Sequence, residues 1–263
     1  IFESAGVLRV DTVEKLFDYA QAFAAQPLPK GSRVAIMSNG GGPAILATDA
    51  VEGEGLTMTE FSPETTARLK AVLADLASAR NPVDMVASAG ATHFEAVGDI
   101  LLNDPNTDAM IVIFVLPITS DSRDVASAIV RAYERNKHLH KPVLVCFMTR
   151  DGDMSGTPIL RNAGLPVYIF PESAVQSLAA MVKYQQVQQR QHGTTKSFDD
   201  VDRASVRKTI DDARAQHRKQ LLPSEVNAIL RAYQFPVLNI QLVDKRDHLA
   251  KASKSVGFPL VMK

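Results

Sequence analysis

From Arg33 to about Gln188, short apolar runs of strand length alternate with stretches whose apolar residues recur every three or four positions. The first pattern is typical of strands and the second of amphipathic helices. The predicted strands are Arg33–Ser38, Leu56–Thr59, Ala109–Leu116, Pro142–Met148 and Pro166–Ile169. The predicted helices are Pro43–Glu54, Pro63–Leu73, Thr92–Leu102, Ser122–Arg135, Ser155–Asn162 and Glu172–Gln188. Such alternation predicts a parallel sheet of about five strands with helices on both faces, an α/β flavodoxin-like doubly wound domain over residues 31–184.

The segments on either side of this domain follow other patterns. Residues 1–30 contain one predicted helix, Val10–Ala25, and residues 185–221 read as a polar, Gln-rich linker followed by a charged helix, Ala204–His217. Residues 222–263 predict, in order, helix Ser224–Tyr233, strand Val237–Val243, helix Asp247–Val256 and a last strand to Lys263. Because about 40 residues cannot enclose a core alone, we expect this segment to open a further domain of a longer polypeptide.

Composition narrows the class of protein. With 46% hydrophobic and 22% charged residues among 263, the chain can bury a core. Its 29 basic and 29 acidic residues balance, which argues against a nucleic-acid binder, and no apolar run approaches the roughly 18–20 residues that span a bilayer. Cys146 is the single cysteine and the six histidines do not cluster, so we predict no disulfide, no metal site, no catalytic residue in this segment, and a cytoplasmic location.

The most informative motif lies between the first strand and its helix. Ser38 is followed by Asn39, Gly40, Gly41 and Gly42, and then by a proline that suits the first turn of a helix. Unpaired N–H groups and the helix dipole at such a position attract phosphate or carboxylate, and ligands of open α/β sheets bind at this edge. We therefore predict phosphate binding by Asn39–Gly42 with support from Ser38, the alternative being a tight turn without a ligand. The spacing fits neither the dinucleotide fingerprint nor a Walker loop.

Three further polar residues are predicted to reach the same edge. Asn81 and Asp84 can brace the glycine loop through hydrogen bonds, or form an Asx turn. Thr119 follows the third strand, where its hydroxyl can donate to an anion or cap the next helix.

Several motifs in series carry a family resemblance, and they cover nearly the whole chain in the right order. They are Ala5–Val10, Ser38–Ala44 with Asp49, Ser62–Thr65, Asn81–Asp84, Phe170–Val175, Leu230–Pro236 and Gly257–Lys263. Together they resemble the NDP-forming acyl-CoA synthetases, also called ADP-forming acetate–CoA ligases, which are relatives of succinyl-CoA synthetase. The resemblance implies a succinyl-CoA-ligase-type domain over residues 31–184, the tail of a preceding domain in residues 1–30, and the beginning of an ATP-grasp domain in residues 222–263.

The resemblance also implies an activity. Such enzymes interconvert acyl-CoA, ADP and phosphate with acid, CoA and ATP through a phosphohistidine, using Mg²⁺. Asn39–Gly42 correspond to a helix N-terminus that faces the phosphohistidine, and Lys263 corresponds to a lysine that contacts nucleotide phosphate. The partners implied are other domains or subunits of the same ligase, a small carboxylic acid and CoA, in a homo-oligomer. The phosphorylated histidine itself is expected upstream of Ile1, so this segment alone is expected to be inactive.

Two other functions remain open from the sequence. The same set of domains occurs fused to an acetyltransferase domain, so the segment can be a regulatory region of a protein lysine acetyltransferase. It can also be a non-catalytic flavodoxin-like binding module, in which the glycine loop holds a regulatory anion or nothing.

Overall fold

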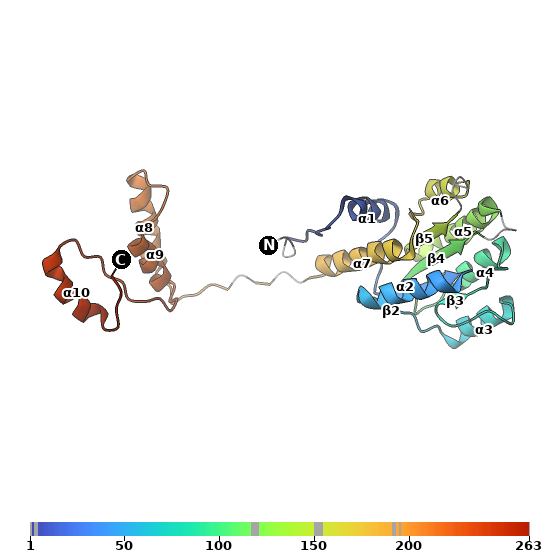
Figure 1. Ribbon diagram of the computed structural model, residues 1–263, viewed down its shortest axis with the longest axis horizontal. Coiled ribbons are helices and arrows are strands. Elements are labelled where there is room, and N and C mark those ends of the chain that lie inside the picture. Colours follow the sequence, from blue (N-terminus) through green and yellow to red (C-terminus); the bar gives the residue numbers. More distant parts are fainter. Residues whose placement is uncertain are drawn as a thin grey trace. The chain divides into compact units, whose positions relative to one another are not determined.

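The computed structural model describes residues 2, 5–116, 121–149, 155–190, 193–194 and 196–262. The chain divides into two compact units, Ile1–Gln191 and His192–Lys263. The first contains a parallel β-sheet with helices packed against it, and the second contains helices and loops in its described part (Figure 1).

The sheet of the first unit contains six strands among the residues described. They are β1 (Arg33–Ser38), β2 (Thr57–Met58), β3 (Val83–Asp84), β4 (Ala109–Val115), β5 (Val143–Met148) and β6 (Val167–Tyr168). Their order is β2-β1-β4-β5-β6, all parallel. β2 pairs with the start of β1 and β3 with its end, so these two short strands share one edge position. With that position counted once, the order is that of a flavodoxin-like doubly wound sheet, so the predicted fold class is confirmed. β3 was not predicted as a strand.

Helices cover both faces of the sheet. Those packed around one core cluster are α1 (Val13–Ala25), α2 (Gly41–Gly53) and α7 (Pro171–Gln188). Those around the other are α3 (Pro63–Val72), α4 (Ala91–Leu102), α5 (Ser122–Asn136), followed by a 3₁₀ turn at Lys137–Leu139, and α6 (Thr157–Asn162). α1 packs against α7 and so lies within the first unit, while the finer domain boundaries drawn from the sequence stay predictions.

Strand β4 shows why the central strands are apolar throughout. Ile111 and Ile113 join the core cluster of α2 and α7, whereas Val112 and Phe114 join the cluster of α4 and α5. Successive side chains of a strand point to opposite faces, and both faces are covered here, so no position of the strand can be polar without being buried.

At the edge of the sheet opposite the glycine loop (Asn39–Gly42), Asp104 lies in the loop before β4 and binds the start of α3. Its side chain is fully buried and accepts hydrogen bonds from the backbone N–H of Ser62 (2.9 Å) and of Asn106 (2.7 Å). Burial by itself raises the pKa of this carboxyl, but hydrogen bonds from the Thr65 side chain and from these backbone groups outweigh it. The net effect is a pKa below the ordinary 3.8.

Replacement of Asp104 by asparagine is expected to lower the free energy of unfolding at pH 7 by about 1–3 kcal/mol, because the charged acceptor is lost. A depressed folded-state pKa stabilises the fold above the unfolded-state pKa, and this contribution disappears as the pH falls through the folded-state pKa. The difference between wild type and variant should therefore shrink below about pH 3.8. Urea titrations from pH 7 to pH 2.5 measure it. The exposed Asp75→Asn serves as control, and a pH-independent difference at Asp104 contradicts the assignment.

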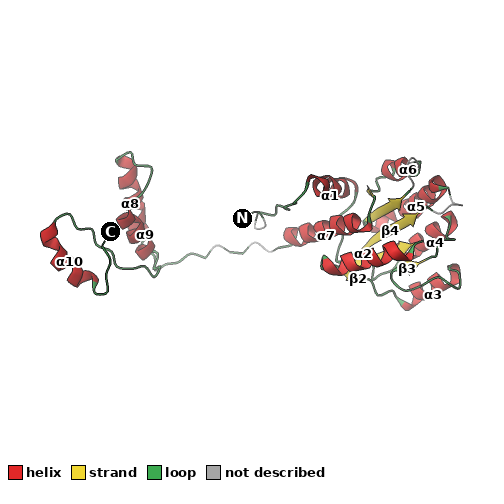
Figure 2. Cartoon of the chain, in the orientation of Figure 1, coloured by secondary structure: helices red, strands yellow, loops and turns green. Residues whose placement is uncertain are grey.

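The second unit contains α8 (Arg203–Ala215), α9 (Pro223–Ala232), a 3₁₀ turn at Arg246–His248 and α10 (Leu249–Val256). The predicted helices are confirmed, but the strands predicted at Val237–Val243 and at the chain end are wrong for the residues described there (Figure 2). Within the described residues, no neighbouring strand offers hydrogen bonds to these segments, and Leu238 and Leu242 are 86% and 83% exposed. Apolar alternation without a partner strand does not form a ladder.

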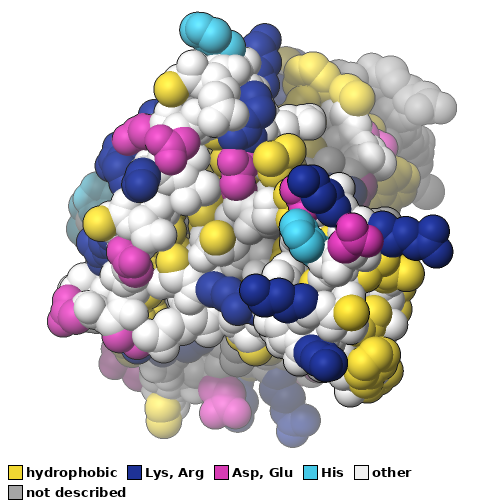
Figure 3. All heavy atoms as spheres, turned by 90° about the vertical axis from the view of Figure 1, so that its left-hand side faces the viewer, with side chains coloured by type: hydrophobic (Ala, Val, Ile, Leu, Met, Phe, Trp, Pro, Cys, Tyr) yellow, Lys and Arg dark blue, Asp and Glu magenta, His cyan; other side chains and the backbone are white. Residues whose placement is uncertain are grey.

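The molecular surface carries both signs of charge. On the face shown in Figure 3, Lys and Arg side chains are interspersed with Asp and Glu and with exposed hydrophobic side chains. This agrees with the balanced composition of the whole chain. Among the helices that the structure describes, none has the length and apolar character needed to cross a bilayer.

Candidate functional site

The glycine loop follows β1 at the carboxyl edge of the sheet. Gly40 is the N-cap of α2 in an extended conformation (φ −141°, ψ 118°) and offers no capping side chain. The Ser38 hydroxyl does not cap the helix either, since it accepts from the Gly40 N–H (3.0 Å) and donates to the Gly40 carbonyl (2.8 Å). Ser38 thus contacts the loop, while its support of phosphate binding stays a prediction. The first turn of α2 is left open at its end.

Two backbone N–H groups of that turn are free. Within the described chain, Gly41 and Gly42 donate to no acceptor, and Gly42 is exposed while Gly41 is half-buried. The first N–H groups of a helix have no intrahelical partner, and with the helix dipole they form an anion-binding end. A Cβ placed on Gly42 meets no atom within 4 Å, so open space lies beside its amide. The arrangement suits a phosphate oxygen.

The Asn39 side chain does not face that space. Its carboxamide donates to the Val115 carbonyl (2.9 Å) and accepts from the Val115 N–H (2.8 Å), and the residue is 3% exposed. Both hydrogen-bonding groups of the side chain are therefore used at the end of β4. Any contribution of Asn39 to phosphate binding stays a prediction, and it concerns the backbone of this residue.

Asp84 lies beside the loop at the end of β3. One carboxylate oxygen accepts from the Val86 N–H (3.0 Å), which is the Asx turn considered from the sequence. The other oxygen faces Gly41, since a Cβ on that glycine would lie 3.1 Å from it. Val86 follows with φ 60°, an uncommon conformation for a β-branched residue. Asp84 thus lies against the loop without a hydrogen bond to it.

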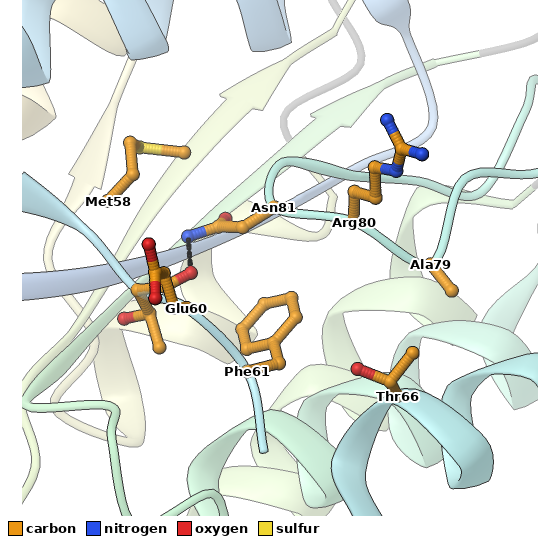
Figure 4. A pocket seen from close by; sticks show the side chains of 8 residues that line it. Met58, Glu60, Phe61, Thr66, Ala79, Arg80 and Asn81 are labelled. Carbon is orange, nitrogen blue, oxygen red and sulfur yellow. Dashed lines mark hydrogen bonds between the residues drawn. The ribbon is translucent and has the colours of Figure 1, made fainter. Parts of the chain in front are cut away.

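Asn81 occupies the seam between β2 and β3 instead of the loop. Its side chain accepts from the Ile36 N–H (2.9 Å) and donates to the carbonyls of Val34 (2.8 Å) and Thr59 (3.1 Å). The carboxamide fills the gap that two short strands leave beside β1, and Figure 4 shows it pointing towards the segment that follows β2. Neither role expected from the sequence, loop brace or Asx turn, describes these contacts.

A cavity of about 360 Å³ opens next to this seam. Its lining is Met58, Thr59, Glu60, Phe61, Thr66, Ala79, Arg80 and Asn81 (Figure 4). No residue of the glycine loop belongs to that lining, so the cavity is separate from the predicted phosphate site. The contacts of Asn39 and Asn81 could not be read from the sequence, because an asparagine beside a glycine or a proline is equally typical of a turn.

Two predicted residues, Thr119 and Lys263, lie outside the described part of the chain. Apolar side chains are exposed at or next to the carboxyl edge: Ile45 (62%), Leu46 (49%), Ile169 (71%) and Phe170 (56%). We call these four residues the apolar rim. Among the residues described, no group of three or more His, Cys, Asp and Glu side chains is placed to hold a metal ion.

Comparison with known proteins agrees with the fold and the motifs. Residues 34–191, more than half of the chain, match the Ligase-CoA domain family, and residues 212–263 match an ATP-grasp domain. The chain is 33% identical over its whole length to the ADP-forming 4-hydroxybutyrate–CoA ligase of Nitrosopumilus maritimus. The chain belongs to the ADP-forming acyl-CoA ligase family. Its match to the Nitrosopumilus maritimus ligase covers 37% of that protein, so it spans well under half of this relative.

Other members of this ligase family show the same partial coverage. The α subunit of the ADP-forming acetate–CoA ligase II of Pyrococcus furiosus is 36% identical over 184 residues, which are 69% of this chain and 40% of the subunit. Relatives thus include subunits of multi-subunit ligases. None of the relatives named here supports the acetyltransferase alternative.

Solved structures of similar proteins share the Ligase-CoA fold. A protein from Pyrococcus horikoshii OT3 superposes with a TM-score of 0.69 at 34% identity, over 72% of this chain and 43% of the other. The dinucleotide-forming acetyl-coenzyme A synthetase 1 of Candidatus Korarchaeum cryptofilum, solved in complex with phosphate and ADP, superposes with a TM-score of 0.66 at 26% identity, over 71% of this chain and 40% of the other.

Proposed function

We propose that this segment is part of an acyl-CoA ligase that makes ATP through a phosphohistidine, and that the α2 N-terminus holds the phosphoryl group during its transfer. The observation that carries the proposal is the pair of free amides at Gly41 and Gly42, at the edge where open α/β sheets bind ligands. Family membership supports the overall reaction, and the phosphate and ADP bound by the Korarchaeum relative fit such chemistry.

The proposed reaction has three balanced steps. Phosphate displaces CoA from acyl-CoA, so the C–S bond breaks, an acyl phosphate forms, and the thiol leaves with a proton. A histidine nitrogen then takes the phosphoryl group from the acyl phosphate, which releases the carboxylate of the acid and a proton from the imidazole; the imidazole regains this proton in the last step. Finally ADP takes the phosphoryl group from the histidine, which gives ATP and regenerates the imidazole.

In these steps the segment stabilises negative charge and takes no part in forming or breaking covalent bonds. The phosphoryl oxygens on the imidazole carry negative charge, and two N–H groups with the dipole of a 13-residue helix face them. Such a helix end contributes about 0.3–1 kcal/mol per exposed charge and up to about 2 kcal/mol when partly buried. This is enough to orient the phosphoryl group but not to break its bond. The histidine and CoA sites belong to the remainder of the proposed enzyme, which also completes the nucleotide site with Mg²⁺ around Lys263 of this segment.

The apolar rim supports a partner at this edge. Ile45 and Leu46 lie in α2, and Ile169 and Phe170 lie at or just before the start of α7, which packs against α2. Exposed apolar side chains of this kind are typical of a surface that another module covers. We infer that the module carrying the histidine docks there, either as another domain of the same chain or as a separate subunit.

Labelling of the full-length protein with [γ-³²P]ATP tests the proposal. We expect an acid-labile, alkali-stable phosphoprotein whose label lies on histidine and moves back to ATP when ADP is added. A protein that stays unlabelled contradicts the ligase function. Transfer of acetyl from acetyl-CoA to a protein lysine by the unlabelled protein would favour the acetyltransferase alternative in its place.

A further inference from the structure

We propose that Asn39 is a positioning residue, whose side chain fixes the free amides of Gly41 and Gly42 by binding the glycine loop to the end of β4. The proposal rests on the proposed function for its catalytic consequence. It is carried by the two hydrogen bonds between the Asn39 carboxamide and the backbone of Val115, at 2.8 and 2.9 Å.

The register of the sheet shows what this carboxamide replaces. β1 and β4 pair in parallel, and their last pair is Ser38 with Ile113. Continued by two residues, the same register would place Gly40 opposite Val115, and Gly40 does lie there, since a Cβ on it would be 3.1 Å from a Val115 methyl group. The backbone N–H and carbonyl of Val115 are nevertheless bound by the Asn39 side chain. The chain can therefore leave the sheet after Ser38 and begin α2, while β4 keeps its hydrogen bonds.

No other described side chain ties the loop to a neighbouring strand through hydrogen bonds. The Ser38 hydroxyl bonds only to Gly40, inside the loop, and the Asp84 carboxylate that faces Gly41 bonds to Val86. Gly40, Gly41 and Gly42 have no side chains of their own to pack. The buried residues Ala44, Ala47 and Val51 hold α2 on the sheet, and Asn39, two residues before Gly41, is the side chain that fixes the loop leading into the two amides. Because a displacement of about 1 Å can cost roughly 10²-fold in rate, loss of this contact should reach the chemistry.

A second buried carboxamide offers a matched control at the opposite edge. Gln26 accepts from the Val143 N–H (2.8 Å) and donates to the carbonyl of Gly164, and it is 7% exposed. It bridges backbone groups as Asn39 does, but at the first residue of β5, so a strand length of about 17 Å separates it from the carboxyl edge. Loss of either carboxamide should destabilise the fold, and only loss of Asn39 should disturb the glycine loop.

The experiment compares Asn39→Leu with Gln26→Met in the full-length protein, since each change roughly keeps the volume of the side chain and removes its polar groups. Amide hydrogen exchange read by mass spectrometry should speed up in the peptide over residues 38–47 for Asn39→Leu and stay unchanged there for Gln26→Met. The single-turnover rate of histidine phosphorylation should fall 10- to 100-fold for Asn39→Leu, with the KM for ADP within twofold. The same rate for Gln26→Met should stay within about threefold of wild type. Asn39→Ala is measured in the same way, in case the leucine variant does not fold.

The outcomes separate the two proposals. Unchanged exchange at residues 38–47 in the Asn39 variants overturns the positioning role, whatever the activity. Faster exchange with an unchanged phosphorylation rate, or an equal loss of rate in Gln26→Met, also overturns it and leaves the ligase function standing. If exchange at residues 38–47 is faster in the Asn39 variants but the wild type forms no phosphohistidine, Asn39 does position the glycine loop and the proposed ligase function is wrong.

Discussion

Replacement of Gly42 by valine is expected to lower the rate of histidine phosphorylation by about 10²-fold while the protein stays folded. The Cβ of a helical residue tilts toward the helix N-terminus, so the new side chain projects into the space in front of the free amides. A Cβ on Gly42 meets no atom within 4 Å, so we expect the valine side chain to fit without displacing its neighbours. Loss of one such donor to a reacting oxyanion typically costs 10²–10³-fold. Rapid-quench labelling with ATP measures the rate, and thermal unfolding reports the stability.

The same helix supplies the control for this variant. Gly53 ends α2, is exposed, and likewise has no atom within 4 Å of a Cβ, so Gly53→Val changes the same helix at its other end. Gly41 is less suitable, because a side chain there would press on the Asp84 carboxylate. If Gly42→Val phosphorylates its histidine as fast as Gly53→Val does, the amides of α2 take no part in the transfer.

Replacement of Phe114 by alanine is expected to lower the free energy of unfolding by about 3–5 kcal/mol. Phe114 in β4 is fully buried between two aromatic rings, edge-on to Phe94 (centroids 5.6 Å apart) and stacked on Phe147 (4.7 Å). Its removal leaves a cavity at the contact between the sheet, α4 and the strand β5, which close packing cannot refill. Guanidinium titration of the chain, followed by circular dichroism, measures the loss.

The exposed Phe170 provides the comparison for this core variant. It is 56% exposed, so Phe170→Ala should change the free energy of unfolding by less than about 1 kcal/mol. Similar losses for the two variants would mean that the aromatic cluster around Phe114 does not hold the sheet to its helices.

The central strands could be predicted because only one kind of structure buries their uninterrupted apolar runs. β1, β4 and β5 are apolar on both faces and begin and end within about one residue of the prediction, since only a sheet covered on both sides can bury such runs. β3 could not be predicted from periodicity. It has only two residues, Val83 and Asp84, and it exists because β1 offers free hydrogen-bonding groups beyond β2.

The strand predicted at Val237–Val243 does not form, because it lacks a neighbouring strand in the described part of the chain. Its apolar residues suit a strand, but strand formation depends on cross-strand partners rather than on local preference. The part of the chain described around it supplies no such partner, and the segment stays without a ladder.

The position of the free amides could be predicted from the sequence, but the direction of the Asn39 side chain could not. Consecutive glycines between a strand and a helix predict open amides at the carboxyl edge, because no other residue leaves that space free. The sequence cannot tell whether an asparagine beside them faces a ligand or the sheet. Asn39 faces the sheet because the Val115 backbone has to be satisfied where β1 turns away, and this requirement exists only in three dimensions.

The apolar rim has one more consequence, which concerns the local dielectric. Water now reaches Gly42, and in bulk water a charge pair at 4 Å interacts by only about 1 kcal/mol. When Ile45, Leu46, Ile169 and Phe170 are covered, that solvent is expelled, and at an effective dielectric constant near 20 the same pair interacts about fourfold more strongly. In the proposed enzyme, docking of the histidine module therefore strengthens the interaction of the α2 amides with the phosphoryl group, and we expect weak phosphoryl binding while the rim is exposed to water.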